Sequence, residues 1–207
     1  MEEIKNFIKT YRCYGVIFIA AINIIWFLYM TVTKKTYSNE GMLACGAMLS
    51  DVLETGNYEQ IFTAFFVHFD ITHLCNNMVM LIAMGAMLEN HTGTKSFLII
   101  YMLSGIGGNI ISAYWHTMQG QIVISAGASG AIFGIVGGFL AAIILNKGRI
   151  KDMTTKKLII FAALSIYQGF ANPGTDNAAH VGGFICGFLA AAVCEIFRKV
   201  SGVKHED

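Results

Sequence analysis

The stretch 125–134 reads Ser-Ala-Gly-Ala-Ser-Gly-Ala-Ile-Phe-Gly and sets one hydroxyl, that of Ser129, between glycines at the start of a long apolar run. One interpretation is chemical: Ser129 is a nucleophile to which Gly127 and Gly130 give close backbone approach. The other is structural, because small residues repeated every four positions let two membrane helices approach closely. Three glycines have that spacing: Gly130, Gly134 and Gly138. Taken alone, the stretch favours helix packing.

Two other apolar runs also begin with polar side chains. His73 and Asn77 are four residues apart, so a helix projects both from one face. His180 shares a helical face with Gly183 and Gly187, which lets a neighbouring backbone approach the imidazole closely. Hydrogen bonding between helices, worth about 1 kcal/mol or less per contact, is the simplest role for such residues. Ionisable groups inside a membrane are nevertheless candidates for function.

The composition indicates a membrane protein. Of 207 residues, 55% are hydrophobic and 13% are charged, about half the charged share of an average soluble domain. We therefore expect an all-α membrane protein whose helices form a single domain over residues 1–207. Hydropathy marks six transmembrane segments: residues 14–33, 72–88, 97–116, 128–146, 158–170 and 178–197.

Several classes of site and partner are not expected. A formal net charge of +1 gives no basic footprint, so no nucleic-acid partner is predicted. The cysteines show no metal-ligand or framework spacing, so we expect neither a metal ion nor a disulfide, and no cofactor. The first apolar segment is too long for the core of a cleaved signal peptide and is interpreted as a membrane helix. The five cysteines are Cys13, Cys45, Cys75, Cys186 and Cys194.

Basic residues predict how the helices are oriented. With six helices, twelve of the fourteen Lys and Arg residues fall on one side of the membrane, and only Lys34 and Lys35 on the other. Basic loops remain in the cytoplasm, so both termini are predicted to be cytoplasmic. Glu89, near the cytoplasmic end of the second segment, is expected to bond loop backbone or to pair with Lys95.

The long segment 34–71 is then an outer loop. Several of its apolar residues recur at helical spacing, which predicts a helix lying in the membrane interface. A loop packed over the mouth of the bundle fits the same residues equally well. They are Tyr58, Ile61, Phe62, Phe65 and Phe69.

Topology distinguishes chemistry from packing for the polar residues. The second, fourth and sixth segments all run inward from the outer side. Four polar residues lie near the starts of these segments: His73, Asn77, Ser129 and His180. They are therefore predicted to share a shallow depth, where they supply a nucleophile, a base and donors for an oxyanion. This coincidence favours chemistry.

These motifs resemble those of the rhomboid family of intramembrane serine proteases and occur in the same order. They are His73-x-x-x-Asn77, Gly127-x-Ser129-Gly130, and His180 with Gly183 and Gly187. His68 and Asn177 also stand where the family often has those residues. The resemblance spans all six predicted helices and implies a rhomboid-type bundle.

The resemblance implies a serine endopeptidase that cleaves transmembrane segments of membrane proteins near the outer leaflet, in contact with membrane lipid. Ser129 and His180 would form a catalytic dyad without a third acid, so Asp176 is given no triad role. His73, Asn77 and the Ser129 N–H would form the oxyanion hole. Substrates would enter beside the fifth helix and the loop that follows it.

Two positions depart from the family pattern. Glu59-Gln60 stands where many relatives have Trp-Arg, which leaves open how the outer loop is anchored. Phe133 replaces a tyrosine that stacks on the catalytic imidazole, so ring stacking is expected to survive while the phenol hydrogen bond is lost.

Other functions and the location of the protein follow from broader features. A catalytically silent relative that binds transmembrane helices is one alternative, although such proteins lose a dyad residue and this chain keeps both. A small transporter is another, but it predicts an internal repeat with broken helices, and none is visible. Short tails and the lack of organelle-targeting features lead us to expect a bacterial cytoplasmic membrane.

Overall fold

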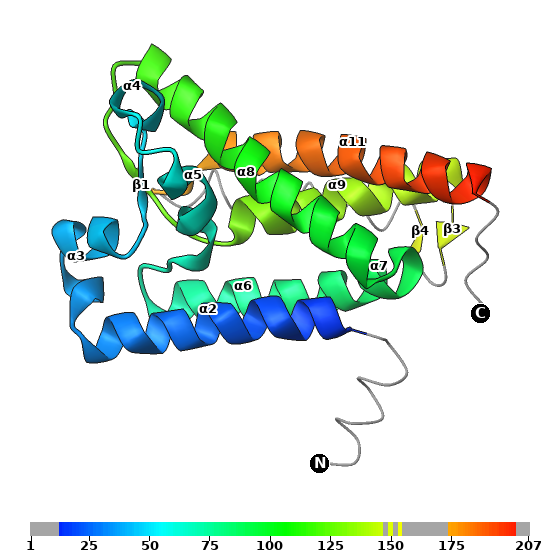
Figure 1. The fold of residues 1–207 in the computed structure, drawn as a ribbon, viewed down its shortest axis with the longest axis horizontal. Helices are drawn as coiled ribbons and strands as arrows, with labels where there is room; N and C mark the ends of the chain where they lie inside the picture. The colour runs from blue at the N-terminus through cyan, green and yellow to red at the C-terminus, as the bar shows by residue number, and fades with distance from the viewer. Residues whose placement is uncertain (1–12, 147–148, 151–152, 155–173, 202–207) are drawn as a thin grey trace.

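Residues 13–146, 149–150, 153–154 and 174–201 are described by the computed structural model, and they are mostly helical (Figure 1). Within these residues, four helices are long and apolar enough to cross a membrane. The helix α9, Ser129–Leu145, is also apolar and has 17 residues. The four long helices are α2 (Tyr14–Val32), the continuous run Ile71–Thr92, α8 (Thr94–Met118) and α11 (Asn177–Val200).

The second predicted segment is longer than hydropathy indicates. It consists of α6 (Ile71–Met80), a π-helical turn (Leu81–Gly85) and α7 (Ala86–Thr92). It begins where the Asp70 carboxylate accepts the His73 N–H at 2.8 Å, and a capping side chain of this kind satisfies a donor that the helix leaves free. It ends at Gly93, whose φ of +81° breaks the helix. The predicted helix 158–170 lies outside the described residues.

Short elements fill the connections between the long helices. The β1–β2 pair is antiparallel, with Met48 opposite Ser125, and it joins the outer loop to the segment that leads into α9. The short helices are Lys35–Tyr37, α3 (Asn39–Ala44), α4 (Val52–Thr55), α5 (Glu59–Thr63) and Ala64–Phe66. The strands are β1 (Met48–Leu49), β2 (Ile124–Ser125), β3 (Arg149–Ile150) and β4 (Met153–Thr154).

The apolar stretch of the outer loop forms two consecutive short helices, α5 and the 3-10 helix Ala64–Phe66, that pack on the bundle. Ile61 and Phe65 are buried against the bundle, whereas Tyr58, Phe62 and Phe69 are exposed. The Ile61 carbonyl accepts the side-chain amide of Asn109 on α8 at 2.9 Å. Packing against the bundle therefore accounts for two of the five apolar residues in the pattern.

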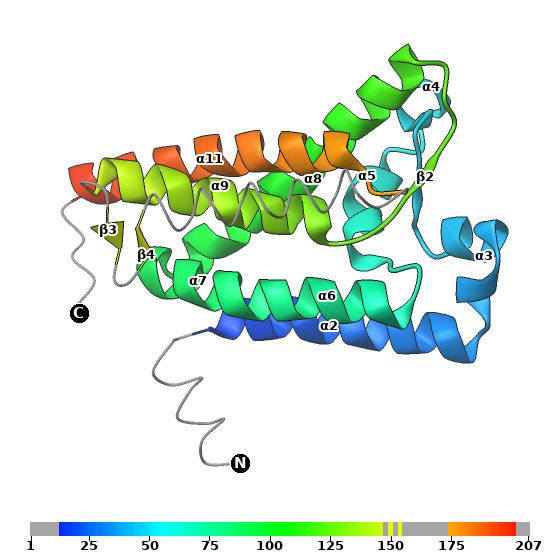
Figure 2. The same ribbon diagram turned by 180° about the vertical axis from the view of Figure 1, so that it is seen from behind.

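The helix α9 occupies the centre of the fold (Figures 1 and 2). Thirteen of its 17 residues are buried, as expected for a helix that is apolar on every side. It packs against α8 and α11, and α2 lies beside α6. The helix α2 instead leaves large apolar side chains exposed along one side, including Ile17, Phe18, Ile25 and Leu28.

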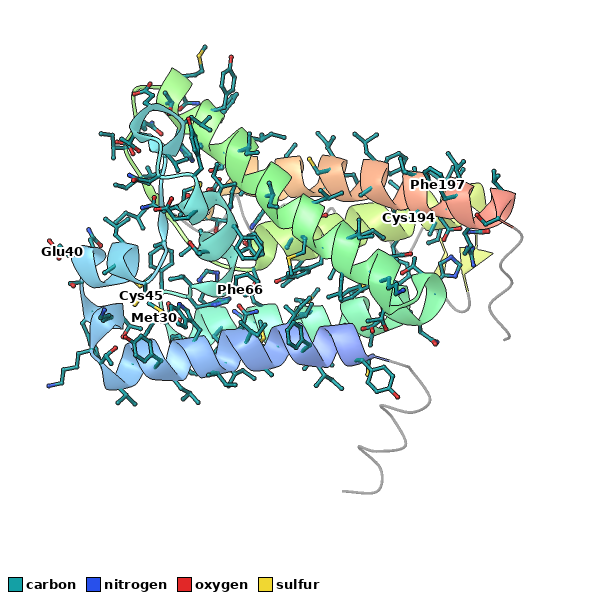
Figure 3. All side chains as sticks on the ribbon, viewed as in Figure 1. Met30, Glu40, Cys45, Phe66, Cys194 and Phe197 are labelled. Carbon is teal, nitrogen blue, oxygen red and sulfur yellow. The ribbon has the colours of Figure 1, made fainter. Side chains whose placement is uncertain are left out.

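The starts of α6, α9 and α11 lie at one end of the bundle, together with α5 and β1–β2 (Figure 2). A small apolar cluster at this end includes Met30 and Cys45, which Figure 3 labels where α2 meets α3. Phe66, also labelled there, belongs to the main core. The three helices therefore run in the same sense, as their sequences predict.

Glu89 joins α2 to α7 at the opposite end. Its carboxylate is 1% exposed and accepts the N–H groups of Gly15 at 2.8 Å and Val16 at 2.9 Å. It also accepts the Thr94 hydroxyl at 2.6 Å. The first N–H groups of a helix have no partner within it, and a carboxylate there also complements the helix dipole. Glu89 therefore bonds backbone, as one of its two predicted roles requires, but the backbone is that of the first turn of α2 and not that of a loop.

Replacing Glu89 by alanine is expected to lower the free energy of unfolding by about 3 kcal/mol, because two buried N–H groups and a hydroxyl lose a charged acceptor. A thermal unfolding measurement in detergent checks this, with Glu40→Ala as the control because Glu40 is exposed (Figure 3). Equal melting temperatures for the two variants would contradict the assigned role.

Candidate active site

Ser129 is the first residue of α9 and follows a turn that only glycine accommodates easily. Gly127 has a φ of +128°, a backbone conformation that side chains disfavour. A Cβ there would also lie 2.6 Å from Cε1 of the His73 ring. The Gly127 N–H donates to the Ala64 carbonyl at 3.0 Å, which fixes the turn to the outer loop. Gly127 thus brings the turn before Ser129 into contact with α6.

His180 lies in the first turn of α11 and contacts Ser129. Its Nε2 is 2.9 Å from the Ser129 Oγ. The imidazole is buried and stacks on the Phe133 ring, with centroids 4.2 Å apart and planes 13° apart. The stacking predicted for Phe133 is therefore present. Among the described residues, His180 Nδ1 has no hydrogen-bond partner, so no carboxylate in this part of the chain completes a triad with it.

His73 and Asn77 line the other side of the turn before Ser129. The His73 ring lies against Gly127, and the Asn77 Nδ2 is 3.8 Å from the position that a Gly127 Cβ would occupy. The Asn77 Nδ2 also donates to the His73 carbonyl at 3.0 Å. The His73 ring and the Asn77 amide of α6 therefore lie beside the turn that leads into Ser129. The first N–H groups of α9, that of Ser129 among them, have no acceptor within the helix.

His68 contacts the same turn and the His73 ring. Its Nε2 accepts the Ala128 N–H at 3.5 Å, and its ring meets that of His73 edge to face with centroids 5.1 Å apart. Burial, with a smaller contribution from the neighbouring His73, lowers the pKa of His68 to about 3. His68 is therefore neutral at physiological pH, as an N–H acceptor must be. The sequence alone indicates His68 only by resemblance.

The predicted glycines of α9 and α11 bring the two helices into backbone contact. A Cβ on Gly183 would overlap the Gly130 carbonyl, and one on Gly187 would overlap the Gly134 carbonyl. Gly138, the third member of the predicted ladder, faces side chains instead of the α11 backbone. Side chains at Gly183 and Gly187 would therefore separate the helices that carry Ser129 and His180.

The outer loop is anchored although it lacks the Trp-Arg pair of many relatives. The Gln60 Oε1 accepts the Leu49 N–H at 3.1 Å, and the Thr63 hydroxyl donates to the Gly46 carbonyl at 2.8 Å. The region predicted for substrate access is the fifth helix, 158–170, with the loop 170–175 that follows it, and only Gly174 and Thr175 of this region belong to the described residues. The five cysteines are free, and within the described residues no cluster of metal ligands is found.

A second polar group near the site, centred on Asp176, has no counterpart in the sequence prediction. Its carboxylate accepts the hydroxyls of Ser112 and Ser125 and the N–H of Ala179. Ser112 and Ser125 are 64 and 51 residues from Asp176 along the chain, so no local spacing connects them. The clue that the sequence does offer is an aspartate one turn before His180.

The fold and the site describe a helical membrane protein with a serine and a histidine in contact at the starts of two helices. The Rhomboid domain model matches residues 55–196 of the chain. The chain therefore belongs to the rhomboid family and is a multi-pass membrane protein, as the sequence predicts.

Relatives with names include several rhomboid proteases. The chain is 32% identical over 172 residues to rhomboid protease GluP of Bacillus subtilis (strain 168), covering 83% of this chain and 33% of that protein. It is 35% identical over 150 residues to RHOMBOID-like protein 5 of Arabidopsis thaliana, covering 72% of this chain and 48% of that protein. With rhomboid protease AarA of Providencia stuartii it shares 30% identity over 191 residues, covering 81% and 68%. The chain thus spans less than half of the first two relatives.

Replacing Gly183 by alanine is expected to destabilise the protein by about 1–3 kcal/mol, the usual cost of forcing extra volume into a packed interface. The added Cβ meets the backbone of α9, which cannot rotate away as a side chain could. Gly138→Ala is the matched control, since its Cβ would lie 3.3 Å from three side-chain atoms. Thermal unfolding of both variants measures the difference, and equal losses would refute the backbone contact.

Proposed function

We propose that this protein is an intramembrane serine endopeptidase that cleaves transmembrane segments of membrane proteins. The observation that carries the proposal is the distance of 2.9 Å between the Ser129 Oγ and the His180 Nε2. Nucleophile and base within hydrogen-bond reach are the signature of an activated serine. Membership in a family with named proteases supports the same assignment.

In the proposed reaction, Ser129 Oγ attacks the scissile carbonyl carbon while its proton passes to His180 Nε2. The tetrahedral intermediate collapses when the C–N bond breaks and His180 gives that proton to the leaving amine. A water molecule then attacks the acyl-serine carbonyl and loses its proton to His180. The second tetrahedral intermediate collapses when the C–O bond to Ser129 breaks, His180 returns the proton to the Ser129 Oγ, and the carboxyl product leaves. The stacked Phe133 ring holds the imidazole plane during both transfers.

The negative charge on the tetrahedral oxygen requires donors already in place. We assign this role to the side chains of His73 and Asn77 and to the N–H of Ser129. Their position around the Gly127 turn supports the assignment, since preorganised donors act best where water does not compete. Gly127 and Gly130 would then leave space around the Ser129 hydroxyl, and Gly183 and Gly187 would let α11 pack closely against α9.

The proposed site lies near the outer leaflet of a bacterial cytoplasmic membrane, with both termini in the cytoplasm. The distribution of basic residues supports this orientation. We also propose that residues 1–207 form one domain, in which α9 and residues 158–170 complete a bundle of six membrane helices in contact with lipid. Substrate helices would reach Ser129 beside the fifth helix.

Replacing Ser129 by alanine is expected to abolish cleavage of a model transmembrane substrate and labelling by a fluorophosphonate, while the melting temperature changes little. The loss follows because no other group on α9 can supply the nucleophile. Substrate cleavage in detergent or proteoliposomes measures the first effect and in-gel fluorescence the second. Residual cleavage by the variant would contradict the dyad. A wild-type protein that neither cleaves nor labels would instead support a silent, helix-binding relative.

Replacing Asn77 by alanine is expected to lower kcat by about a hundredfold or more, because one oxyanion donor is worth about 3–4 kcal/mol. KM should change little, since the donor acts on the transition state. Asn23→Ala is the matched control: the Asn23 Nδ2 bonds the carbonyl four residues earlier, as Asn77 does, but lies on α2. Steady-state kinetics on one transmembrane peptide compare them. An unchanged kcat in the Asn77 variant would assign this residue to packing.

A further inference from the structure

The two halves of the proposed dyad start on separate helices, so something must fix the start of α9 relative to the start of α11. The glycine contacts that hold the two helices in backbone contact, Gly183 with Gly130 and Gly187 with Gly134, lie after Ser129 and His180 in both chain segments. A second restraint lies before both residues, and it is the carboxylate of Asp176.

Asp176 connects three segments through its two oxygens. Oδ1 accepts the Ala179 N–H at 2.9 Å and so caps the start of α11. Oδ2 accepts the hydroxyl of Ser112 on α8 and, at 2.7 Å, the hydroxyl of Ser125 in β2. Both serines are buried, and hydrogen bonds to an ionised acceptor are about twice as strong as neutral ones. The carboxylate is therefore a bridge and not only a cap.

The two ends of the Asp176–Ser125 bond lie at the same distance along the chain from the two residues of the proposed dyad. Asp176 precedes His180 by four residues, and its carbonyl accepts the His180 N–H at 3.2 Å. Ser125 precedes Ser129 by four residues and is held in turn by the pairing of β2 with β1. The Asp176–Ser125 bond therefore links the segments that lead directly into the two residues of the proposed dyad.

We propose that Asp176 is a positioning residue that sets the separation and alignment of Ser129 and His180, an inference that rests on the proposed function. It acts through the backbone and not as a third acid, because its oxygens bond Ser112, Ser125 and Ala179, not the imidazole. The nearby His116 Nε2 is 3.7 Å from Oδ1 and partly exposed, where such an ion pair contributes little.

Three substitutions distinguish the hydrogen bonds of Asp176 to the two serines from its capping of α11 and from its negative charge. Asp176→Ser keeps a good helix cap, but its shorter side chain cannot also reach Ser112 and Ser125. Asp176→Asn keeps the shape: its oxygen still caps α11, and its amide donates to the serine hydroxyls, which can accept. Ser125→Ala removes one arm of the bridge and leaves the backbone pairing of β2 in place.

The measurement is the rate constant for fluorophosphonate labelling of Ser129 in the full-length protein, which needs no substrate entry. We expect Asp176→Ser to slow labelling by about tenfold to a hundredfold, since misplacing reacting groups by about 1 Å can cost about a hundredfold. On a transmembrane substrate, kcat should fall in parallel while KM stays within about twofold. Ser125→Ala should slow labelling by about threefold to tenfold, and Asp176→Asn should restore the rate to within about threefold of wild type.

Glu195→Gln is the control for a loss of stability alone. Glu195 is the buried acceptor at the other end of α11, where Arg198 and Asn146 donate to its Oε2 at 2.6 and 3.2 Å. Its Oε1 lies 2.9 Å from the Nε2 of His91. This variant should lower the melting temperature and leave the labelling rate of the folded protein unchanged.

Three outcomes overturn the inference. Wild-type labelling rates in Asp176→Ser and Ser125→Ala would show that Asp176 only caps α11. If Asp176→Ser does not fold, the labelling rate of Ser125→Ala alone tests the inference. An Asp176→Asn protein as slow as Asp176→Ser would assign the effect to charge rather than position. A wild-type protein that does not label at all would overturn the proposed function as well, which distinguishes that failure from the other two.

Discussion

The backbone contact between α9 and α11 is the constraint on which the rest of this structure depends. Helices with ordinary side chains pack about 8–10 Å apart, whereas Gly183 lies directly against the carbonyl of Gly130. Because lipid supplies no hydrophobic drive for helix association, close van der Waals packing of this kind holds membrane helices together. The same contact brings Ser129 and His180 within 2.9 Å of each other. Packing and the geometry of the site therefore have one cause.

Carboxylates complement this packing at the starts of three helices. Glu89 accepts N–H groups at the start of α2, Asp70 at that of α6 and Asp176 at that of α11. Backbone donors without partners are costly where water is scarce, so a charged acceptor at a helix start both satisfies them and complements the dipole. Each carboxylate also determines the residue at which its helix begins, because it binds the first N–H groups of that helix. Two of the three helices begin within one turn of a proposed site residue, His73 or His180.

The sequence predicts the long helices of the described residues and the convergence of the candidate site residues, because hydropathy and polar residues at equal depth are local or topological signals. It places helix ends less well, since these depend on single groups such as Asp70 and Gly93. For the outer loop, the repeat of apolar residues fits both an amphipathic helix and a loop packed on the bundle, and only tertiary packing determines that Phe65 is buried while Phe62 is exposed. The bridge of Asp176 to Ser125 joins residues far apart in the chain, and no periodicity reveals it.

The surroundings of His180 explain how an imidazole can be oriented without a third acid. In a serine triad a carboxylate fixes the orientation and tautomer of the histidine, whereas here Nδ1 has no partner among the described residues. Two other restraints act on the ring: the stacked face of Phe133 limits its rotation, and the first turn of α11 fixes its backbone. In the proposed reaction Nε2 accepts the Ser129 proton, which requires that the neutral ring carry its own proton on Nδ1. Packing of the His180 ring between α9 and α11 then orients the imidazole, as a carboxylate does in a catalytic triad.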